Sequence, residues 1–301
     1  MWNSGSPMSS CTAEELRMNA WRETRTRVTA ALGALMLLAT ATACGEEAPT
    51  FLGRDRLNVA YKADQPGTSY WDGEKYGGFD QFIGAHVVDE LGVKYAPRLL
   101  TSNMRETEIT EGISDLVIAT YSITETRAED VAFVGPYAVT PQGYMVGPGN
   151  PDIDREEDLR DKRICTMGST TAEESLVNRG LKKITMVTTA SECVRLLLAG
   201  ETDAFFMDKM ILYGFQQNHP AEDLRVLPEN AGQPQLYGIG LPKGHQEDCE
   251  QLKEIVKTYV RSSKWRADFE ASLPDFTREH SNEVDQYRPN DTLVDKYSCV
   301  E

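Results

Sequence analysis

An arginine and several hydroxyl side chains follow a short apolar run in the middle of the chain. The run Leu116–Ala119 has the composition of a buried strand, and it is followed by Thr120, Ser122 and Thr124 and then by Arg127. Hydroxyl groups at the end of a strand, with a guanidinium one loop later, predict a polar pocket. Because the planar guanidinium donates two parallel hydrogen bonds to a carboxylate, the pattern predicts a site for a small carboxylate.

Arg127 also has a second interpretation, which its immediate neighbours supply. A surface ion pair with Glu125 or Glu129 is the role we would expect of a lone arginine in this stretch. A second apolar run, Val131–Val134, follows, and Gly135-Pro136 is expected to end it. The choice between the two roles depends on what else the chain offers to a carboxylate.

The stretch from Asp115 to Tyr137 resembles the signature of the polar amino-acid-binding proteins that serve ABC transporters. That family places a strand, a Ser/Thr-Ile-Thr turn and an arginine before an apolar strand that ends in Pro-Tyr, here Ser122-Ile123-Thr124, Arg127 and Pro136-Tyr137. The resemblance covers most of residues 55–245 and is closest to the actinobacterial glutamate-binding lipoproteins. It implies an α/β, two-lobed, type II periplasmic-binding-protein-like fold with a hinge of two crossover segments.

Two further matches lie near the start of the expected fold. The strand Leu57–Tyr61 leads into Asp64-Gln65-Pro66-Gly67, a turn at the sheet edge where open α/β sheets place ligands, and this turn resembles the glutamate-binding relatives. Gly77-Gly78-Phe79-Asp80 resembles the family's Gly-Phe-Asp start of the first helix, with Asp80 as a helix cap. Apolar residues at helical spacing then predict core packing at Phe82, Ile83, Val87, Val88 and Leu91.

The second half of the chain offers a partner for Arg127. The predicted strand Arg163–Met167 leads into Gly168-Ser169-Thr170-Thr171 and a helix through Val177. The first backbone N–H groups of such a helix attract a carboxylate, although the same residues also make an ordinary N-cap. The segment resembles the family's Gly-Ser-Thr carboxylate loop, which implies the first of these roles.

Asp208 ends the predicted strand Thr202–Met207. The resemblance implies that this aspartate receives the ligand ammonium, and a helix-capping role is compatible with that. We expect Ser122 and the carbonyl of Thr120 to join it around the ammonium and its neighbouring atoms. Many relatives carry a second acid at the next position, where this chain has Lys209, so the selectivity for the ligand side chain stays open on this ground.

The predicted ligand site joins these segments across the two lobes. Arg127 and the N–H groups of Thr170 and Thr171 are expected to hold the α-carboxylate. Since one lobe supplies Arg127 and the other supplies Asp208, the ligand favours the closed state over the open one. The residues predicted to bind the ligand are Lys62, Asp64, Gln65, Thr120, Ser122, Arg127, Gly168, Thr170, Thr171 and Asp208.

Lys62 is the residue that we expect to set specificity. It follows the first strand and so lies at the sheet edge where ligands bind. In a chain with a formal charge of −16, an anionic ligand side chain needs a local cation in addition to Arg127. We therefore predict an acidic amino acid, glutamate, with its side-chain carboxylate facing Lys62. The alternative is a solvated lysine, as most lysines are.

Composition and motifs argue against several other classes of protein. The chain has 31 basic and 47 acidic residues, whereas phosphate binding needs a basic face, so nucleic acid is not expected as a partner. Phosphate-loop and nucleophile-elbow motifs are missing, the four histidines lack metal spacing, and the acidic stretch 152–158 does not fit a calcium loop. We predict no cofactor, no metal and no catalysis. Asp64 is the only acid/base candidate for a dehydratase-like enzyme on this fold.

Residues 1–43 have the pattern of an export signal, with a basic segment before an apolar run that is too short to span a membrane. Ala41-Thr42-Ala43-Cys44 resembles a lipoprotein signal box, which implies that Cys44 is acylated and anchors the protein to the outer face of the cytoplasmic membrane. The alternative is ordinary cleavage near Ala43, which leaves Cys44 as a free thiol. Residues 44–55 are predicted to be a linker.

Four further cysteines are expected to form disulfides, because an exported protein faces an oxidising exterior. Four cysteines permit three pairings, and the sequence alone does not choose among them. Pairing within each region, Cys165 with Cys193 and Cys249 with Cys299, is the simplest arrangement. The first of these pairs also resembles one in the glutamate-binding relatives.

The domain prediction places residues 56–143 and 236–301 in lobe 1 and residues 144–235 in lobe 2. Glycine-containing segments at Gly143–Gly149 and Gly232–Gln235 are the predicted crossovers between the lobes. The resemblance implies a monomer that delivers its amino acid to an ABC transporter permease in the membrane. A surface sensor whose closed form signals to another protein is the alternative.

Overall fold

The computed structural model describes residues 50–300 of the chain. The predicted signal peptide 1–43, the predicted lipid site at Cys44 and the first part of the linker lie outside the described residues. Within the described part, no helix is both long and apolar enough to cross a membrane.

Strands alternate with helices along most of the described chain, as the sequence predicts for an α/β protein. The strands are β1 (Arg56–Lys62), β2 (Asp64–Gln65), β3 (Ser69–Trp71), β4 (Tyr76–Gly77), β5 (Lys94–Leu100), β6 (Leu116–Val117), β7 (Ala132–Val146), β8 (Ile164–Met167), β9 (Ile184–Val187), β10 (Ala204–Asp208), β11 (Arg225–Val226) and β12 (Ala231–Leu241). The α-helices are α1 (Phe79–Leu91), α2 (Arg105–Thr110), α3 (Glu125–Ala128), α4 (Thr171–Asn178), α5 (Ala190–Leu198), α6 (Lys209–Asn218), α7 (Gln246–Arg261), α8 (Ser263–Ser272), α9 (Pro274–Glu279) and α10 (Asp291–Tyr297).

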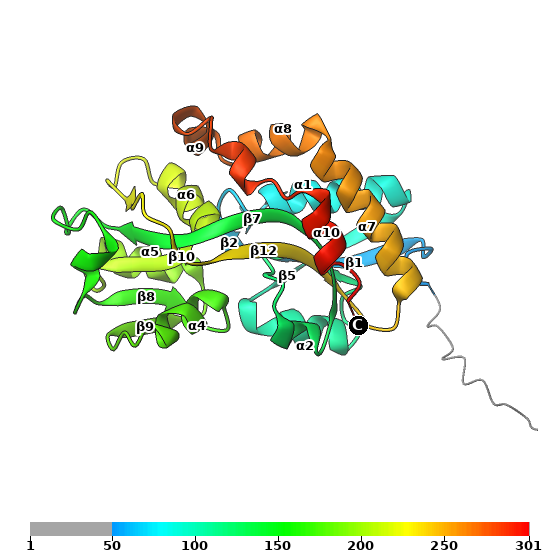
Figure 1. Cartoon of the computed structure of the whole chain (residues 1–301), viewed down its shortest axis with the longest axis horizontal. Coiled ribbons are helices and arrows are strands. Elements are labelled where there is room, and N and C mark those ends of the chain that lie inside the picture. The colour runs from blue at the N-terminus through cyan, green and yellow to red at the C-terminus, as the bar shows by residue number, and fades with distance from the viewer. Residues whose placement is uncertain (1–49, 301) are drawn as a thin grey trace, which may run out of the picture. The chain divides into compact units, whose positions relative to one another are not determined.

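Two long antiparallel strands, β7 and β12, join the two halves of the main sheet. The strand order is β5-β1-β6-β12-β7-β10-β8-β9, with β11 paired to β7. On one side β1 runs parallel to β5 and β6, and on the other β8 runs parallel to β9 and β10. Figure 1 shows β7 and β12 side by side through the middle of the fold. The strands that end in polar residues therefore lie on both sides of this pair.

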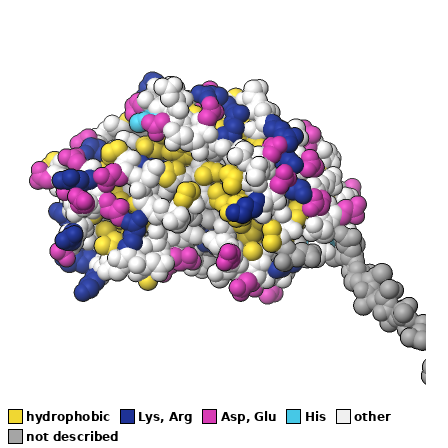
Figure 2. Space-filling view, in the orientation of Figure 1, with side chains coloured by type: hydrophobic (Ala, Val, Ile, Leu, Met, Phe, Trp, Pro, Cys, Tyr) yellow, Lys and Arg dark blue, Asp and Glu magenta, His cyan; other side chains and the backbone are white. Residues whose placement is uncertain are grey.

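The apolar residues form separate cores on the two sides of the β7–β12 pair. Every member of the second core lies between Tyr144 and Ala231, and we call this part the second lobe and the rest of residues 50–300 the first lobe. Apart from Met210 of α6, the first core and a smaller third core belong to the first lobe. Figure 2 shows acidic and basic side chains mixed over one face, with hydrophobic side chains across its middle.

The prediction that Gly135-Pro136 ends the apolar strand is wrong. Strand β7 continues through this pair to Val146 and contributes residues to both cores. The reason is a register shift in β12, which pairs Tyr237 with Ala138 but Ile239 with Val134. The extra residues of β7 form a bulge there, and the ladder resumes beyond it.

Asp80 is not the cap of the first helix, contrary to the prediction. The N-cap of α1 is Gly78, and Asp80 lies within the first helical turn. Its carboxylate points into the first lobe instead, where it accepts hydrogen bonds from the backbone N–H of Thr120 and the hydroxyl of Tyr137, both at 2.7 Å. Burial raises the pKa of Asp80 to about 6, and these hydrogen bonds oppose the shift. Asp80 therefore holds the polar turn after β6 against α1.

Both disulfides are present in the structure with the predicted pairing. Cys165 of β8 is bonded to Cys193 of α5, with their Cα atoms 5.5 Å apart. Cys249 of α7 is bonded to Cys299, which follows α10, with a Cα separation of 5.7 Å. Each bond joins elements of one lobe, so neither restricts movement of one lobe relative to the other.

Removing the Cys249–Cys299 disulfide should lower the free energy of unfolding by about 2–4 kcal/mol, because the unfolded chain gains conformational freedom. This bond closes a sequence separation of 50 residues, against 28 for the other. Urea unfolding of a Cys249→Ser/Cys299→Ser variant measures the change. The matched variant Cys165→Ser/Cys193→Ser should lose slightly less, and unchanged unfolding free energies in both variants would contradict this view.

Candidate functional site

Arg105 is a buried cation between the lobes, and the sequence reasoning missed it. It begins the short helix α2, and its side chain is 3% exposed. Within the first lobe it donates to the carbonyls of Ser102 (3.1 Å) and Thr120 (3.3 Å). Its Nη2 atom donates across to the carbonyl of Ser169 in the second lobe at 3.0 Å. The Arg105 guanidinium therefore forms hydrogen bonds to both lobes.

Arg127 lies beside Arg105 and shares two of its partners. Its Nη2 donates to the same Ser169 carbonyl at 3.5 Å, and its Nη1 donates to the carbonyl of Ser122 at 2.8 Å. Both guanidinium groups lie over the ring of Tyr121, at 5.2 Å for Arg127 and 4.7 Å for Arg105. Two neighbouring guanidinium groups aimed at one carbonyl form a strong site for a carboxylate, since an anionic acceptor binds these donors more tightly.

Arg127 does not form the surface ion pair with Glu125 or Glu129 that is the alternative to a carboxylate-binding role. Its side chain is nine-tenths buried, and its Nε lies 3.4 Å from Glu106 rather than against Glu125 or Glu129. Thr124 caps the short helix α3 by accepting from the backbone N–H of Arg127. The turn that the sequence singled out thus fixes the arginine backbone and directs its side chain inward.

Lys62, the last residue of β1, is buried as well, with a side chain 1% exposed. Its Nζ donates to the hydroxyl of Ser102 at 2.7 Å, and the carbonyl of the same serine accepts from Arg105. Burial, together with the nearby charge of Arg105, lowers the pKa of Lys62 to about 7. The alternative of a solvated lysine is therefore ruled out, and Lys62 belongs to the same cationic cluster as the two arginines.

Asp208 supplies the opposite charge from the second lobe. It is the last residue of β10 and is 1% exposed. Its oxygens accept from the hydroxyl of Tyr237 at 2.7 Å and from the amide of Gln142 at 3.3 Å. Burial raises its pKa to about 6, opposed by these hydrogen bonds and by the charges of the two arginines. It is therefore an ionised group near neutral pH that can pair with an ammonium.

The loop before α4 lies against the arginines. Thr170 is the N-cap of this helix: its hydroxyl accepts from the N–H of Glu173 and donates to the carbonyl of Met167. Thr171 begins the helix, so its backbone N–H has no acceptor within the helix itself. Its hydroxyl accepts from Gln142 at 3.4 Å, and Gln142 also reaches Asp208. The N-cap interpretation is confirmed, and it leaves the helix start beside the charged groups.

Gln65 and Thr120 are hydrogen-bonded to each other beside Met167, which precedes this loop. The hydroxyl of Thr120 donates to the side-chain oxygen of Gln65 at 2.8 Å, and the amide of Gln65 lies 3.8 Å from the sulfur of Met167. The carbonyl of Thr120, predicted to receive the ligand ammonium, accepts instead from Arg105. The carboxylate of Asp64 does not contact these residues and accepts hydrogen bonds from the backbone N–H groups at the start of α5.

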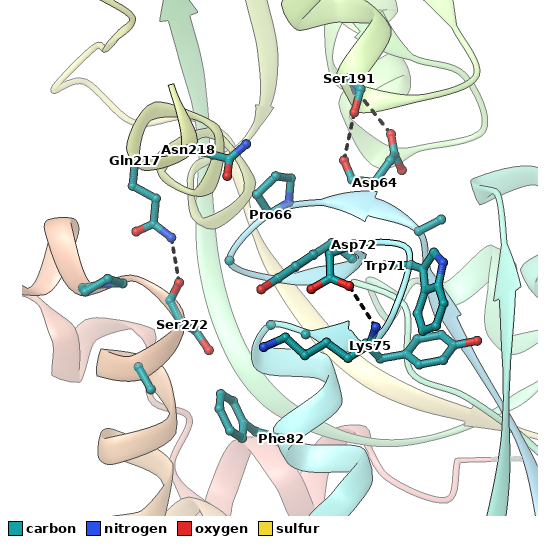
Figure 3. Close-up of a pocket in the computed structure, with 18 residues that line it drawn as sticks. Asp64, Pro66, Trp71, Asp72, Lys75, Phe82, Ser191, Gln217, Asn218 and Ser272 are labelled. Atoms are coloured by element: carbon teal, nitrogen blue, oxygen red, sulfur yellow. Dashed lines mark hydrogen bonds between the residues drawn. The ribbon is translucent and has the colours of Figure 1, made fainter. Parts of the chain in front are cut away.

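The charged cluster is distinct from a cavity of about 750 Å³ at the edge of the two lobes. Figure 3 shows this cavity between Trp71, Lys75 and Phe82 of the first lobe and Gln217 and Asn218 of the second. Among residues 50–300, no group of three or more histidine, cysteine, aspartate or glutamate side chains is placed to hold a metal ion. The candidate functional site is accordingly the cluster of Lys62, Arg105, Arg127 and Asp208 with the loop from Gly168 to Thr171.

Comparison with known proteins gives matches that extend over both lobes. The family model described as bacterial extracellular solute-binding proteins, family 3, matches residues 57–272. The glutamate-binding protein GluB of Corynebacterium glutamicum is 32% identical over 289 residues, which cover 90% of this chain and 97% of that protein. GluB of Corynebacterium efficiens is 30% identical over 285 residues, or 88% and 96% of the two chains.

A solved structure agrees with these matches. An ancestral arginine-binding protein bound to glutamine is 26% identical and superposes with a TM-score of 0.67, covering 73% of this chain and 98% of its own. A solute receptor for L-cysteine from Neisseria gonorrhoeae, 22% identical, superposes with a TM-score of 0.70 over 77% of this chain and 96% of its own, and it supports the fold alone.

Proposed function

The chain belongs to family 3 of the bacterial extracellular solute-binding proteins and has the two-lobed type II periplasmic-binding-protein fold, and from this premise we propose that it captures a free amino acid between its lobes. Members of this family are binding proteins, so the chain is not an enzyme. One observation carries the proposal: two buried arginines of the first lobe point at one carbonyl of the second, with Asp208 nearby.

An α-amino acid matches this charge arrangement. We assign its α-carboxylate to Arg127 and to the N–H groups at the start of α4, where the anion also meets the positive end of the helix dipole. The ligand then replaces the carbonyl of Ser169 as the acceptor of the arginine hydrogen bonds. The ammonium group pairs with Asp208, whose two present partners are neutral.

The cationic excess of the cluster favours an acidic ligand, and we propose glutamate. When Asp208 balances the ligand ammonium, the three basic groups Lys62, Arg105 and Arg127 face the α-carboxylate alone, which leaves up to two positive charges in excess. A second ligand carboxylate placed against Lys62 reduces this excess and is itself buried as part of an ion pair. The printed names of the two GluB relatives point to the same ligand.

Binding of glutamate should weaken as the pH rises above neutrality. The pKa of Lys62 is lowered to about 7, and a ligand carboxylate next to its Nζ stabilises the protonated form. Above about pH 7 the protein must therefore take up a proton on binding, and the affinity falls by up to about tenfold per pH unit. Glutamine, which has no side-chain charge, should bind with little pH dependence.

Calorimetric titrations with both ligands, from about pH 7 to about pH 9, where Asp208 stays ionised, measure this difference. A Lys62→Met variant is the control, because it should remove the pH dependence of glutamate binding. Glutamate affinity that stays constant over the whole range would rule out contact with Lys62.

The remaining parts of the proposal concern delivery of the ligand. We propose that the first lobe comprises residues 56–143 and 236–301 and that the second lobe extends a little beyond its core, over residues 144–235, with β7 and β12 as the hinge. The closed monomer hands its amino acid to an ABC transporter permease. Acylation of Cys44 anchors it to the outer face of the cytoplasmic membrane. The presence of separate cores on each side of the long strands supports a hinge at this place.

A thermal-shift screen of the twenty amino acids on the protein without its signal peptide tests the proposed function. A ligand that binds only the native state raises the melting temperature, so glutamate should give the largest increase. A screen in which no amino acid raises the melting temperature would contradict the proposed function. A preference for a neutral or basic amino acid would leave amino-acid binding in place and overturn the choice of glutamate.

A further inference from the structure

The carboxylate of Asp64 bonds across the gap between the lobes. Asp64 belongs to β2 in the first lobe, and its Oδ2 atom accepts hydrogen bonds from the backbone N–H groups of Ala190 (2.6 Å) and Ser191 (3.2 Å). The hydroxyl of Ser191 in turn lies 3.4 Å from the carbonyl of Asp64. Figure 3 shows the contacts between Asp64 and Ser191 at one edge of the cavity between the lobes.

Helix α5, which begins at Ala190, depends on this contact for its N-terminal cap. Its own N-cap residue, Thr189, makes no side-chain hydrogen bond to the first turn. The first N–H groups of a helix have no partner within it, and a negative charge there also interacts favourably with the helix dipole. Asp64 therefore provides from the other lobe what a local serine or aspartate provides in most helices.

The cap joins two well-anchored elements. On the second lobe, α5 is tied to β8 by the disulfide between Cys193 and Cys165. On the first lobe, β2 pairs with β3, and the neighbouring residue Gln65 is held by the hydroxyl of Thr120. The Asp64 contact therefore connects two elements that are each fixed within their own lobe.

We propose that Asp64 is a positioning residue that stabilises the closed arrangement of the lobes, while it contacts no ligand atom. The effect on affinity rests on the proposed function, since it requires a ligand that binds between the lobes. A protein that binds only when closed has an apparent affinity equal to its intrinsic affinity multiplied by the fraction of molecules that are closed. Loss of the Asp64 cap should therefore weaken all ligands by the same factor, unlike a change at Lys62.

The first test compares Asp64→Ala with the control variant Asp72→Ala. Asp72 follows β3 of the same three-stranded sheet and also accepts two backbone hydrogen bonds, from Glu74 and Lys75, but both are within its own lobe. Titration calorimetry with glutamate and with glutamine should show both affinities about tenfold lower in Asp64→Ala and unchanged in Asp72→Ala. Unchanged affinities, or a loss confined to one ligand, would overturn the proposal.

The second test needs no ligand and so separates this proposal from the proposed function. Amide hydrogen exchange at Ala190 and Ser191 is measured on the ligand-free protein. Exchange should be faster in Asp64→Ala than in the wild type, and unchanged in Asp72→Ala. If the wild type bound no amino acid but this difference were present, the cap would stand and the proposed function would fail. Equal exchange in all three proteins would show that the cap does not form.

Discussion

Replacing Arg127 with alanine should abolish measurable amino-acid binding while the protein remains folded. The guanidinium is nine-tenths buried, and its Nη atoms reach the carbonyls of Ser122 and Ser169. Loss of a charge-assisted contact to a buried carboxylate lowers binding by about 2–3 kcal/mol or more, because the carboxylate loses one of its two guanidinium neighbours. Calorimetric titration of the variant, with circular dichroism to verify the fold, measures the loss.

Two companion variants sharpen this test. Arg54→Ala removes an exposed arginine of the same lobe, paired with Asp115, and should leave the affinity unchanged. Arg127→Lys keeps the charge but loses the planar fork, so it should recover only part of the binding. An Arg127→Ala protein that is folded and binds its ligand with nearly the wild-type affinity would end the assignment of the α-carboxylate to this residue.

Replacing Lys62 with methionine should weaken glutamate by about 2–3 kcal/mol more than it weakens glutamine, because only glutamate loses a buried ion pair. Methionine retains much of the volume of the lysine side chain, so packing around β1 should change little. Lys75→Met changes an exposed lysine of the nearby hairpin and is the control, with both affinities unchanged.

The comparison of the two ligands decides the role of Lys62. Equal weakening of glutamate and glutamine would indicate that the lysine only supports the fold of the site. A wild-type protein that prefers glutamine or arginine over glutamate would also contradict the prediction, since the positive charges of the cluster would then not select an acidic ligand.

Residues at the ends of strands and the starts of helices were the predictable part of the site. Arg127 and Asp208 follow apolar runs, and Gly168–Thr171 separates a strand from a helix, so the local pattern indicates positions near strand ends. For Arg127, the choice of a carboxylate site over a surface ion pair depended on the family resemblance. Arg105 carries no such signal. It begins a six-residue helix with a charged sequence, typical of a solvated surface, and its burial depends on contacts with Tyr121 and with Ser169, 64 residues away.

The same distinction holds for the fold. Strands with several buried residues, such as β1, β8 and β10, are predicted from their composition. Strands β5 and β9 are not, because only Leu100 is buried in the first and no residue is buried in the second. The extent of β7 depends on its pairing with β12 through a bulge, which is a tertiary property and not a local one.

A crystal structure of the protein with bound glutamate tests the central claim most directly. The α-carboxylate should lie within hydrogen-bonding distance of Arg127, the ammonium against Asp208, and the side-chain carboxylate against Lys62. Glutamate bound elsewhere, for example in the cavity beside Trp71, or bound between the lobes without contact to Arg127 and Asp208, would contradict it.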